Sequence, residues 1–257
     1  MDLGLKERTA LVLASTNGLG LACAVALAAE GVRVAVNGRN RERVLATAND
    51  LPASVGITYD LAADGAAAAI VQRAGEALGR IDILVLNAGG PPAGAAVGVT
   101  RHAMQTALDG LLLAQIEAVN LVVGDMQQRR WGRIIAVGSS GVQAPLPNLA
   151  ASNAARGALA GYLKTLASEV APAGVTVNMV LPGRFDTARV RELDGLRADA
   201  NGVTPTEIRS QSERAIPARH YGNPAQFGSL VCFLAGESAA YITGAQIRCD
   251  GGLIAAN

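Results

Sequence analysis

The sequence predicts a single α/β domain in which a doubly wound parallel sheet carries helices on both faces. Short apolar runs rich in β-branched residues alternate with Ala- and Leu-rich helical patterns along the whole chain, and this alternation is typical of βαβ units. The chain has 257 residues, half of them apolar, which suits one domain with a large core. No internal repeat or low-complexity linker divides it, so we expect one domain over 1–257.

Seven strands are expected from the short apolar runs. The run Ile83–Ala88 is apolar almost throughout, as a strand covered on both faces should be. The expected strands, in chain order, are Thr9–Ser15, Val32–Gly38, Gly56–Leu61, Ile83–Ala88, Arg133–Ser139, Val175–Leu181 and Gln246–Asp250. The helical patterns that separate or follow them cover 18–30, 40–50, 63–79, 100–130, 150–171 and 224–236.

One region, 183–219, lacks this regular alternation. It contains Pro205, Pro217 and several charged residues, so we expect a loop with a short helix near Thr206–Ala215. A long excursion after the carboxyl end of a strand is where α/β enzymes hold a segment that covers the substrate. The sequence therefore predicts a substrate-loop region at 183–219 within the single domain.

The composition excludes several classes of function. Charged residues make up 17% of the chain and the net charge is +1, which argues against a nucleic-acid groove or a polybasic membrane surface. Cys23, Cys232 and Cys249 lie far apart without metal-ligand spacing, so no metal site is expected. The N-terminus is charged where a signal peptide would be apolar, and no run reaches the ~18 apolar residues of a membrane span. We expect a cytoplasmic protein.

A glycine-containing turn follows the first expected strand and opens the first expected helix. Glycines in such a turn let the backbone approach a pyrophosphate, and the helix N-terminus offers free N–H groups. A glycine pair alone is a weak signal, but the strand–turn–helix context strengthens it and indicates a Rossmann-type nucleotide site. The residues expected to contact the nucleotide here are Ala14, Ser15, Asn17, Gly18, Leu19 and Gly20.

Motifs along the whole chain resemble the short-chain dehydrogenase/reductase family. The turn matches that family's T-G-x-x-x-G-x-G at Gly18 and Gly20, with Ala14 at its first glycine. The family's catalytic helix reads K-A-A-L-A-G-x-x-K-x-L-A, and residues 156–167 of this chain read RGALAGYLKTLA. Further matches to the family are Asn87-Ala88-Gly89, the P-G-x-x-x-T pattern over 182–187, Tyr241–Gly244 and Asp250–Gly252. The overall pattern is similar to 3-oxoacyl-carrier-protein reductases.

The resemblance implies a nicotinamide dinucleotide as cofactor. Asp60 matches the family aspartate that contacts adenine, and Asn87, Ala88 and Gly89 match the turn that lies against the ribose. Arg39 occupies the place where NAD-preferring relatives carry an acidic residue, and its fork suits a 2′-phosphate. We therefore expect NADP(H) to be favoured over NAD(H). Pro182, Gly183 and Thr187 match the residues that flank the nicotinamide.

The resemblance also assigns the catalytic positions, and most of them are altered. Ser139 matches the serine that hydrogen-bonds the substrate oxygen. The tyrosine that transfers the proton is Ser152, thirteen residues later, and the lysine that holds the ribose is Arg156. Leu111 falls where the family has an asparagine that holds a relay water. Tyr162 lies nearly three turns beyond Ser152 and cannot replace the tyrosine.

Three functions remain open from the sequence. The first is an NADP-dependent oxidoreductase acting on a small carbonyl or alcohol, with Ser139, Ser152 and Arg156 as its catalytic residues. The second is a catalytically disabled protein that keeps the fold and binds a nucleotide or other ligand. The third is a lyase or isomerase that uses the same pocket. The resemblance also implies a homo-oligomer formed through the helices at 100–130 and 150–171.

Overall fold

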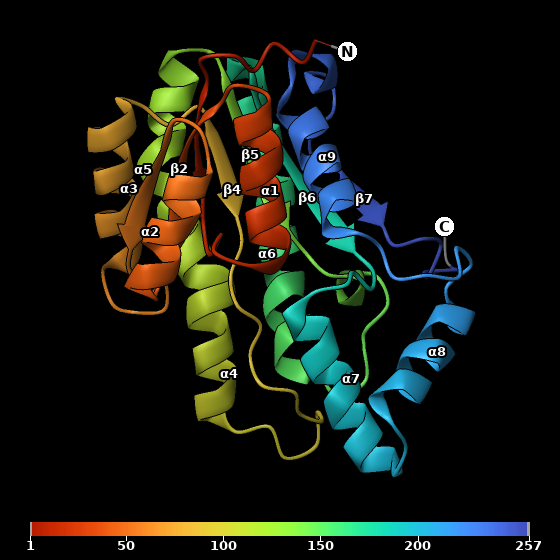
Figure 1. Cartoon of the computed structure of the whole chain (residues 1–257). Helices are drawn as coiled ribbons and strands as arrows, with labels where there is room; N and C mark the ends of the chain where they lie inside the picture. The colour runs from red at the N-terminus through yellow and green to blue at the C-terminus, as the bar shows by residue number, and fades with distance from the viewer. Residues whose placement is uncertain (1, 256–257) are drawn as a thin grey trace.

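The chain folds around a seven-stranded, all-parallel sheet with the order β3-β2-β1-β4-β5-β6-β7. A computed structural model describes residues 2–255 (Figure 1). The strands are β1 Thr9–Val12, β2 Arg33–Gly38, β3 Ser54–Thr58, β4 Ile83–Leu86, β5 Gly132–Val137, β6 Val175–Pro182 and β7 Gln246–Cys249. The order reverses direction between β1 and β4, and ligands of open α/β sheets bind outside the carboxyl ends at such a point. The doubly wound fold and all seven expected strands are confirmed.

The third strand differs most from its expected position. The sequence predicted Gly56–Leu61, whereas β3 pairs with β2 from Ser54 and ends at Thr58. Asp60 ends the extended run because its Oδ1 accepts a hydrogen bond from the backbone N–H of Ala62 at 3.1 Å. This local side-chain bond turns the backbone away from the sheet.

Helices cover both faces of the sheet, as expected (Figure 1). One buried cluster joins the sheet to α1 and α9, and a second joins the opposite face to α3, α5 and α6. The helices of these two layers are α1 Gly18–Ala29, α2 Arg41–Asp50, α3 Ala66–Leu78, α5 Ala114–Gln128, α6 Ala150–Val170 and α9 Pro224–Ala235. Residues that alternate along the central strands separate into the two clusters, as the two-residue period of a strand requires.

The segment expected as one helix over 100–130 is interrupted. It consists of α4 Arg101–Leu108, a π-helical turn Asp109–Leu113, and α5. By length and composition, Arg101–Gln128 is apolar enough to cross a membrane. Its buried residues, however, pack in the protein core with α3, α6 and the sheet. A π-turn inside an α-helix often marks a functional position, and Leu111 lies within this one.

The region 183–219 is more ordered than the sequence predicted. It contains two helices, α7 Ala188–Asn201 and α8 Pro205–Ala215, instead of a loop with one short helix. Thr187 caps α7 by accepting from the N–H of Val190, and Gly202 ends it in a left-handed conformation. The two helices extend beyond the carboxyl ends of the strands (Figure 1), where a substrate-covering segment was expected.

A buried polar network attaches this pair of helices to the end of β6. Arg184 forms an ion pair with Asp194 of α7 and donates to the hydroxyl of Tyr221 at 3.0 Å. That hydroxyl in turn donates to Asp194 at 2.7 Å. Tyr221 and Asp194 are nearly inaccessible to solvent, so the network fixes the position of α7 over the sheet edge.

Candidate active site

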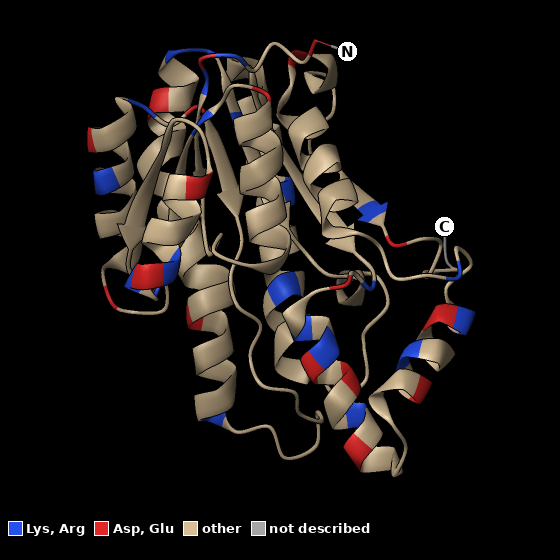
Figure 2. Ribbon diagram, in the orientation of Figure 1, with Lys and Arg blue, Asp and Glu red and all other residues tan. Residues whose placement is uncertain are grey.

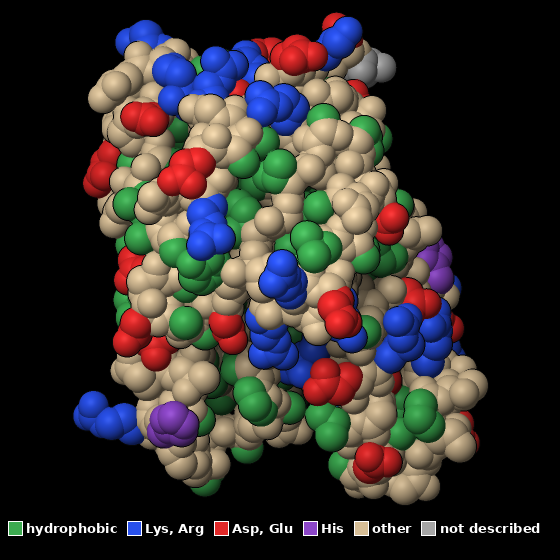
Figure 3. Space-filling model, turned by 60° about the vertical axis from the view of Figure 1, so that its left-hand side comes forward, with side chains coloured by type: hydrophobic (Ala, Val, Ile, Leu, Met, Phe, Trp, Pro, Cys, Tyr) green, Lys and Arg blue, Asp and Glu red, His purple; other side chains and the backbone are tan. Residues whose placement is uncertain are grey.

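The predicted site residues gather at the carboxyl edge of the sheet. The first turn follows β1, the Asn87–Gly89 turn follows β4, and Ser139 follows β5. Pro182 ends β6, and Thr187 caps the start of α7. Figure 3 shows the face of the molecule where Lys and Arg side chains gather above a hollow between two lower lobes. Segments distant in sequence therefore meet at one edge.

The turn after β1 is held in a strained conformation. Ala14 has φ +45°, a left-handed value that costs a non-glycine residue about 1–2 kcal/mol. Two asparagines support the strain: Asn37 Oδ1 accepts from the Ala14 N–H at 3.1 Å, and Asn87 Nδ2 donates to the Ala14 carbonyl at 3.0 Å. The Asn87 side chain thus braces the turn, and the buried Ser15 side chain bonds to Val12 within the fold at 2.8 Å.

The start of α1 has the properties of a phosphate site. Asn17 is the N-cap of α1, yet its side chain makes no capping hydrogen bond, so the first N–H groups of the helix stay available. Gly20 cannot be replaced without a clash, because a Cβ there would lie 2.5 Å from the Ala14 carbonyl and from Asn87 Nδ2. Free N–H groups and the positive end of the helix dipole suit a diphosphate, so the residues present fit a dinucleotide.

Arg39 and Asp60 lie at the ends of β2 and β3, away from the catalytic positions. Three strand spacings, about 14 Å, separate β2 from β5, so only an extended ligand could contact both regions. Arg39 is exposed and forms no ion pair within the described part of the chain, 2–255. Its guanidinium is free to meet an anionic group.

The other glycines expected to contact the cofactor differ in how much space surrounds their backbone. A Cβ added to Gly89 would meet nothing within 4 Å, and Ala88 is half-buried beside it. Gly183 is confined instead, since its Cβ would lie 2.7 Å from the Asp250 backbone. A Cβ on Gly18 would lie 3.8 Å from the methyl group of Thr187. The start of α7 therefore closes over the turn that precedes α1.

Ser139 is oriented by the turn that it begins. Its Oγ accepts a hydrogen bond from the N–H of Gly141 at 3.0 Å, so its own proton remains available for a ligand oxygen. A Cβ on Gly141 would clash with Asn153 Oδ1 and approach Ser139 Oγ to 3.2 Å. This close approach brings Ser139 against the first turn of α6, which also carries the half-buried Ser152.

Arg156 is the most unusual side chain of the site. It is 8% exposed, and its Nη1 donates to the carbonyl of Val137 at the end of β5 at 2.7 Å. Burial, assisted by the charge of Arg189, lowers the pKa of Arg156 to about 10. The guanidinium is still charged at neutral pH. It lies one helical turn after Ser152, so the two side chains share a face of α6.

The relay-water position is filled with apolar groups. Leu111 is 1% exposed and packs with Ala107 and Ala155. One turn further, Gln115 is fully buried, and neither atom of its amide has a hydrogen-bond partner among the described residues. The resemblance placed Leu111 at the family's asparagine position, but nothing in the sequence indicated that Gln115 would be buried without a partner.

The sequence analysis did not identify Arg189. Its Nη2 donates to the carbonyl of Pro91 at 2.7 Å, and its Nη1 pairs with Glu192 at 2.9 Å. These contacts join α7 to the loop after β4. The only local signal was a basic residue two positions after the P-G-x-x-x-T motif. Figure 2 shows basic positions on α7 and on the neighbouring part of α6 below the sheet.

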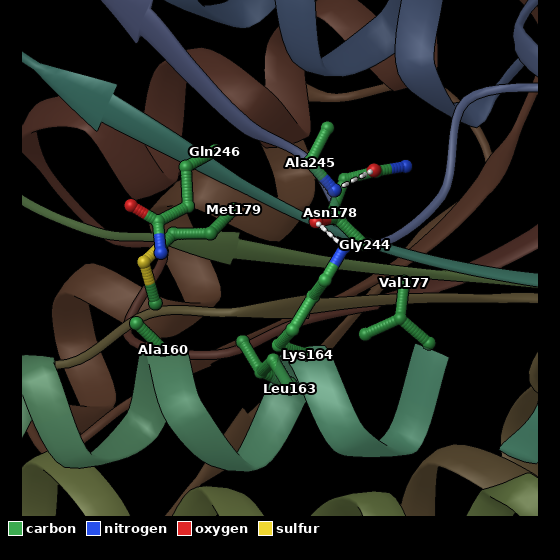
Figure 4. A pocket seen from close by; sticks show the side chains of 9 residues that line it. All are labelled: Ala160, Leu163, Lys164, Val177, Asn178, Met179, Gly244, Ala245 and Gln246. Atoms are coloured by element: carbon green, nitrogen blue, oxygen red, sulfur yellow. Dashed lines mark hydrogen bonds between the residues drawn. The ribbon is translucent and has the colours of Figure 1, made fainter. Parts of the chain in front are cut away.

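A small pocket between α6, β6 and the turn before β7 has a structural role. Lys164 closes it by donating to the Gly244 carbonyl at 3.1 Å (Figure 4). Asn178 binds both sides of the adjoining turn, donating to Ile242 at 2.7 Å and accepting from Ala245 at 3.1 Å. These bonds hold β7 against β6. The candidate active site is therefore the carboxyl edge of the sheet and not this pocket.

Comparison with known proteins identifies the family of the chain. A family model described as enoyl-(acyl carrier protein) reductase matches residues 13–254. The chain is 33% identical to dehydrogenase/reductase SDR family member 4 of Sus scrofa, over 96% of this chain and 88% of that protein. It is 32% identical to the 3-oxoacyl-[acyl-carrier-protein] reductase MabA of Mycobacterium avium, over 96% and 90%. The chain belongs to the short-chain dehydrogenase/reductase family.

The structure of this family member resembles those of solved relatives over its whole length. L-sorbose reductase from Gluconobacter frateurii, complexed with NADPH and L-sorbose, superposes with a TM-score of 0.94 at 26% identity, with 100% of each chain covered. The matched relatives are named reductases and dehydrogenases. The chain is therefore an oxidoreductase by family, which is the first of the three functions that the sequence left open.

Proposed function

We propose that this short-chain dehydrogenase/reductase is an NADP-dependent reductase of a small carbonyl compound, with an altered catalytic site. The observation that carries the proposal is a combined site at one sheet edge: an uncapped α1 N-terminus for a diphosphate, exposed Arg39 for a 2′-phosphate, and Ser139 with a free hydroxyl proton. The NADPH present in the L-sorbose reductase complex supports the cofactor.

The catalytic residues act by binding and polarisation. NADPH supplies the hydride when it is bound. Ser139 donates its hydroxyl proton in a hydrogen bond to the carbonyl oxygen, where negative charge develops, and Arg156 supplies a fixed positive charge that orients the bound molecule beside it. Arg156 is not assigned the proton transfer, because its guanidinium is held by the Val137 carbonyl and acts as a fixed cation. Ser152 passes a proton from water to the product oxygen.

Nucleotide titration followed by a substrate screen tests the proposal. NADPH should quench or enhance protein fluorescence on binding, and loss of NADPH absorbance should reveal turnover on small ketones. Replacing Ser139 with Ala should lower kcat about 100-fold, the loss typical of one transition-state hydrogen-bond donor. Failure of both NADPH and NADH to bind contradicts the proposal.

Arg39→Asp tests the cofactor preference. The substitution places a carboxylate where the 2′-phosphate would bind, so NADPH affinity should fall at least tenfold while NADH affinity changes little. Arg101→Asp on α4 is the matched control, because it makes the same charge change at another exposed position. Equal losses for the two nucleotides would show that Arg39 does not read the 2′-phosphate.

The packing of Leu111 favours one alternative, a disabled protein that binds the nucleotide without turnover. Its place in an apolar cluster leaves no room for a relay water. The triple variant Leu111→Asn, Ser152→Tyr, Arg156→Lys restores the family residues. Tight NADPH binding without turnover in the native protein, together with reductase activity in the variant, would establish the alternative. Native turnover would reject it.

We further propose a cytoplasmic homo-oligomer built on α5 and α6. Both helices expose small or apolar residues on one side: Leu121 is 50% exposed, and a Cβ on Gly157 or Gly161 would meet nothing within 4 Å. Tyr162 of α6 also bonds to Asn120 of α5 at 3.4 Å. The two helices thus present one continuous surface of low relief.

A further inference from the structure

A nine-tenths-buried guanidinium without an acidic partner needs an explanation. Among residues 2–255, Arg156 forms no ion pair, and its one hydrogen bond uses Nη1. Its Nε and Nη2 have no hydrogen-bond partner among the described residues. Neither atom is fully enclosed by the protein. Buried charges are normally paired, because an unpaired one loses its hydration without compensation. The Nε and Nη2 donors of Arg156 thus keep some access to solvent and are free to bind a ligand.

A second guanidinium lies over the neighbouring strand. Arg156 is anchored to Val137 at the end of β5, and the Arg189 side chain lies against Gly90, where its Nε would be 3.6 Å from an added Cβ. Gly90 follows β4, which pairs directly with β5. The charge of Arg189 also disfavours protonation of Arg156. Arg189 is therefore close enough to Arg156 to affect its charge; Arg189 has its own partner in Glu192, whereas no carboxylate among residues 2–255 pairs with Arg156.

We propose that Arg156 and Arg189 form a carboxylate-binding subsite, so that the substrate is a small oxo acid. The inference rests on the proposed reductase function, because it names the substrate class of the same pocket. The free Nε and Nη2 of Arg156 match the two oxygens of a carboxylate in a bidentate pair. Arg189 covers the pair from α7 and adds a second positive charge.

The serines complete the recognition of an oxo acid. With the carboxylate on Arg156, the oxo group can reach Ser139, whose proton is free, because Ser139 packs against the first turn of the same helix. Ser152 lies in the first turn of α6, one helical turn before Arg156. A single small molecule can therefore use the charge of Arg156 and the hydroxyl group of Ser139 together.

The test compares acetoacetate with methyl acetoacetate, which have the same oxo group but differ in charge. Calorimetry with NADP⁺-loaded protein, and with protein free of nucleotide, should show that acetoacetate binds at least tenfold more tightly than the ester. Arg156→Met should abolish the preference, and Arg156→Lys should keep part of it, because lysine keeps the charge but not the fork. Arg189→Gln should reduce the preference severalfold.

Arg191→Gln is the matched control. Arg191 lies two residues beyond Arg189 on α7, and its ion pair is with Asp186, so the acid-to-ester ratio should not change. Equal binding of acid and ester to the native protein, or a preference that survives Arg156→Met, overturns the subsite. Inorganic diphosphate is the competing anion. If diphosphate displaces NADPH, and if Arg189→Gln weakens the binding of diphosphate, then Arg189 serves the cofactor and the substrate proposal is wrong.

The two proposals fail separately. NADPH binding, followed by fluorescence, tests the reductase function, whereas the acid-to-ester ratio can be measured without nucleotide. A protein that binds NADPH and reduces small ketones, but treats acid and ester alike, is a reductase of neutral carbonyls. A protein that prefers the acid but binds no nucleotide keeps the subsite and loses the reductase function.

Discussion

Ala14 shows how a single residue can limit a nucleotide site. Alanine stands here at the first glycine of the family's turn, and its φ is +45°. Hydrogen bonds from Asn87 and to Asn37 hold the strained conformation in place. The strain is therefore maintained by neighbours that also shape the approach to α1, so stability and nucleotide affinity should depend on the same methyl group.

Ala14→Gly should increase both quantities. Removing the strain of a left-handed alanine should raise the free energy of unfolding by about 1–2 kcal/mol. The greater conformational freedom of glycine in the unfolded chain should lower it by about 0.4–1 kcal/mol. Urea denaturation should therefore show a net gain of about 0.5–1 kcal/mol, and fluorescence titration should show tighter NADPH binding. Ala53→Gly is the control, because Ala53 has φ +52° at an exposed turn. It should stabilise similarly and leave NADPH affinity unchanged; a parallel rise in affinity would contradict a local effect of Ala14.

The ionisation of Arg156 gives the carboxylate subsite a pH limit. Burial, and secondarily the charge of Arg189, lowers the pKa of this guanidinium to about 10. The cation is favoured below that value, so acetoacetate affinity should be constant from pH 6 to 9 and fall as the pH rises through about 10. Calorimetry across this range measures the effect, with methyl acetoacetate as the uncharged control. Constant acetoacetate affinity up to pH 11 would contradict it.

At the scale of elements, α5 carries an unsatisfied polar group into the core. Met126 of α5 contacts Gly132 at the start of β5, since a Cβ there would lie 2.6 Å from it. The eleven residues back to Gln115 rise about 16 Å along the helix, close to the length of β5, about 17 Å. Gln115 therefore lies level with Val137, the residue that anchors Arg156.

Gln115→Met should stabilise the protein. The two side chains have similar volume, and removing an amide that lacks partners recovers its desolvation penalty of about 1–3 kcal/mol. Urea denaturation should show that gain, whereas Gln127→Met on the exposed side of α5 should stay within about 0.5 kcal/mol of the native protein. A loss of stability in Gln115→Met would instead show that the amide holds a buried water.

The sequence could predict the elements whose signals are local. Runs such as Ile83–Ala88 mark strands because the β-branched and apolar residues of a doubly covered strand have few alternatives. The helix α7 was missed although Thr187 and Gly202 are ordinary start and stop signals, because nearby prolines and charges suggested a loop. The π-turn at Asp109–Leu113 was not predicted, because a wider backbone hydrogen-bond pattern defines it and no start or stop residue marks it.

The candidate site divides in the same way. Ser139, Ser152 and Arg156 could be located because their spacing along the chain is regular. The contact of Arg189 with Pro91 joins residues 98 positions apart, and nothing in either local sequence announces it. Burial of Arg156 without a carboxylate is likewise a property of the assembled fold. From this burial we infer that the substrate carries a negative charge, which the sequence position alone did not indicate.

At the scale of the whole molecule, the exposed face of α5 and α6 should join subunits. An added Cβ at Gly161 of α6 would meet nothing within 4 Å, and Leu121 of α5 is half exposed. Gly161→Arg adds a long charged side chain to an exposed helix position, where it raises helix propensity and leaves the fold intact, but it prevents close approach of a second copy.

Light scattering after gel filtration should therefore give a dimer or tetramer for the native protein and a smaller species for Gly161→Arg. Gly195→Arg makes the same change on α7, also with nothing within 4 Å, and should keep the native mass. Because the active site lies at the carboxyl edge and not on this face, the smaller species should still bind NADPH. A native protein that is monomeric at about 10 μM, the range where standard-size interfaces are populated, would refute the interface.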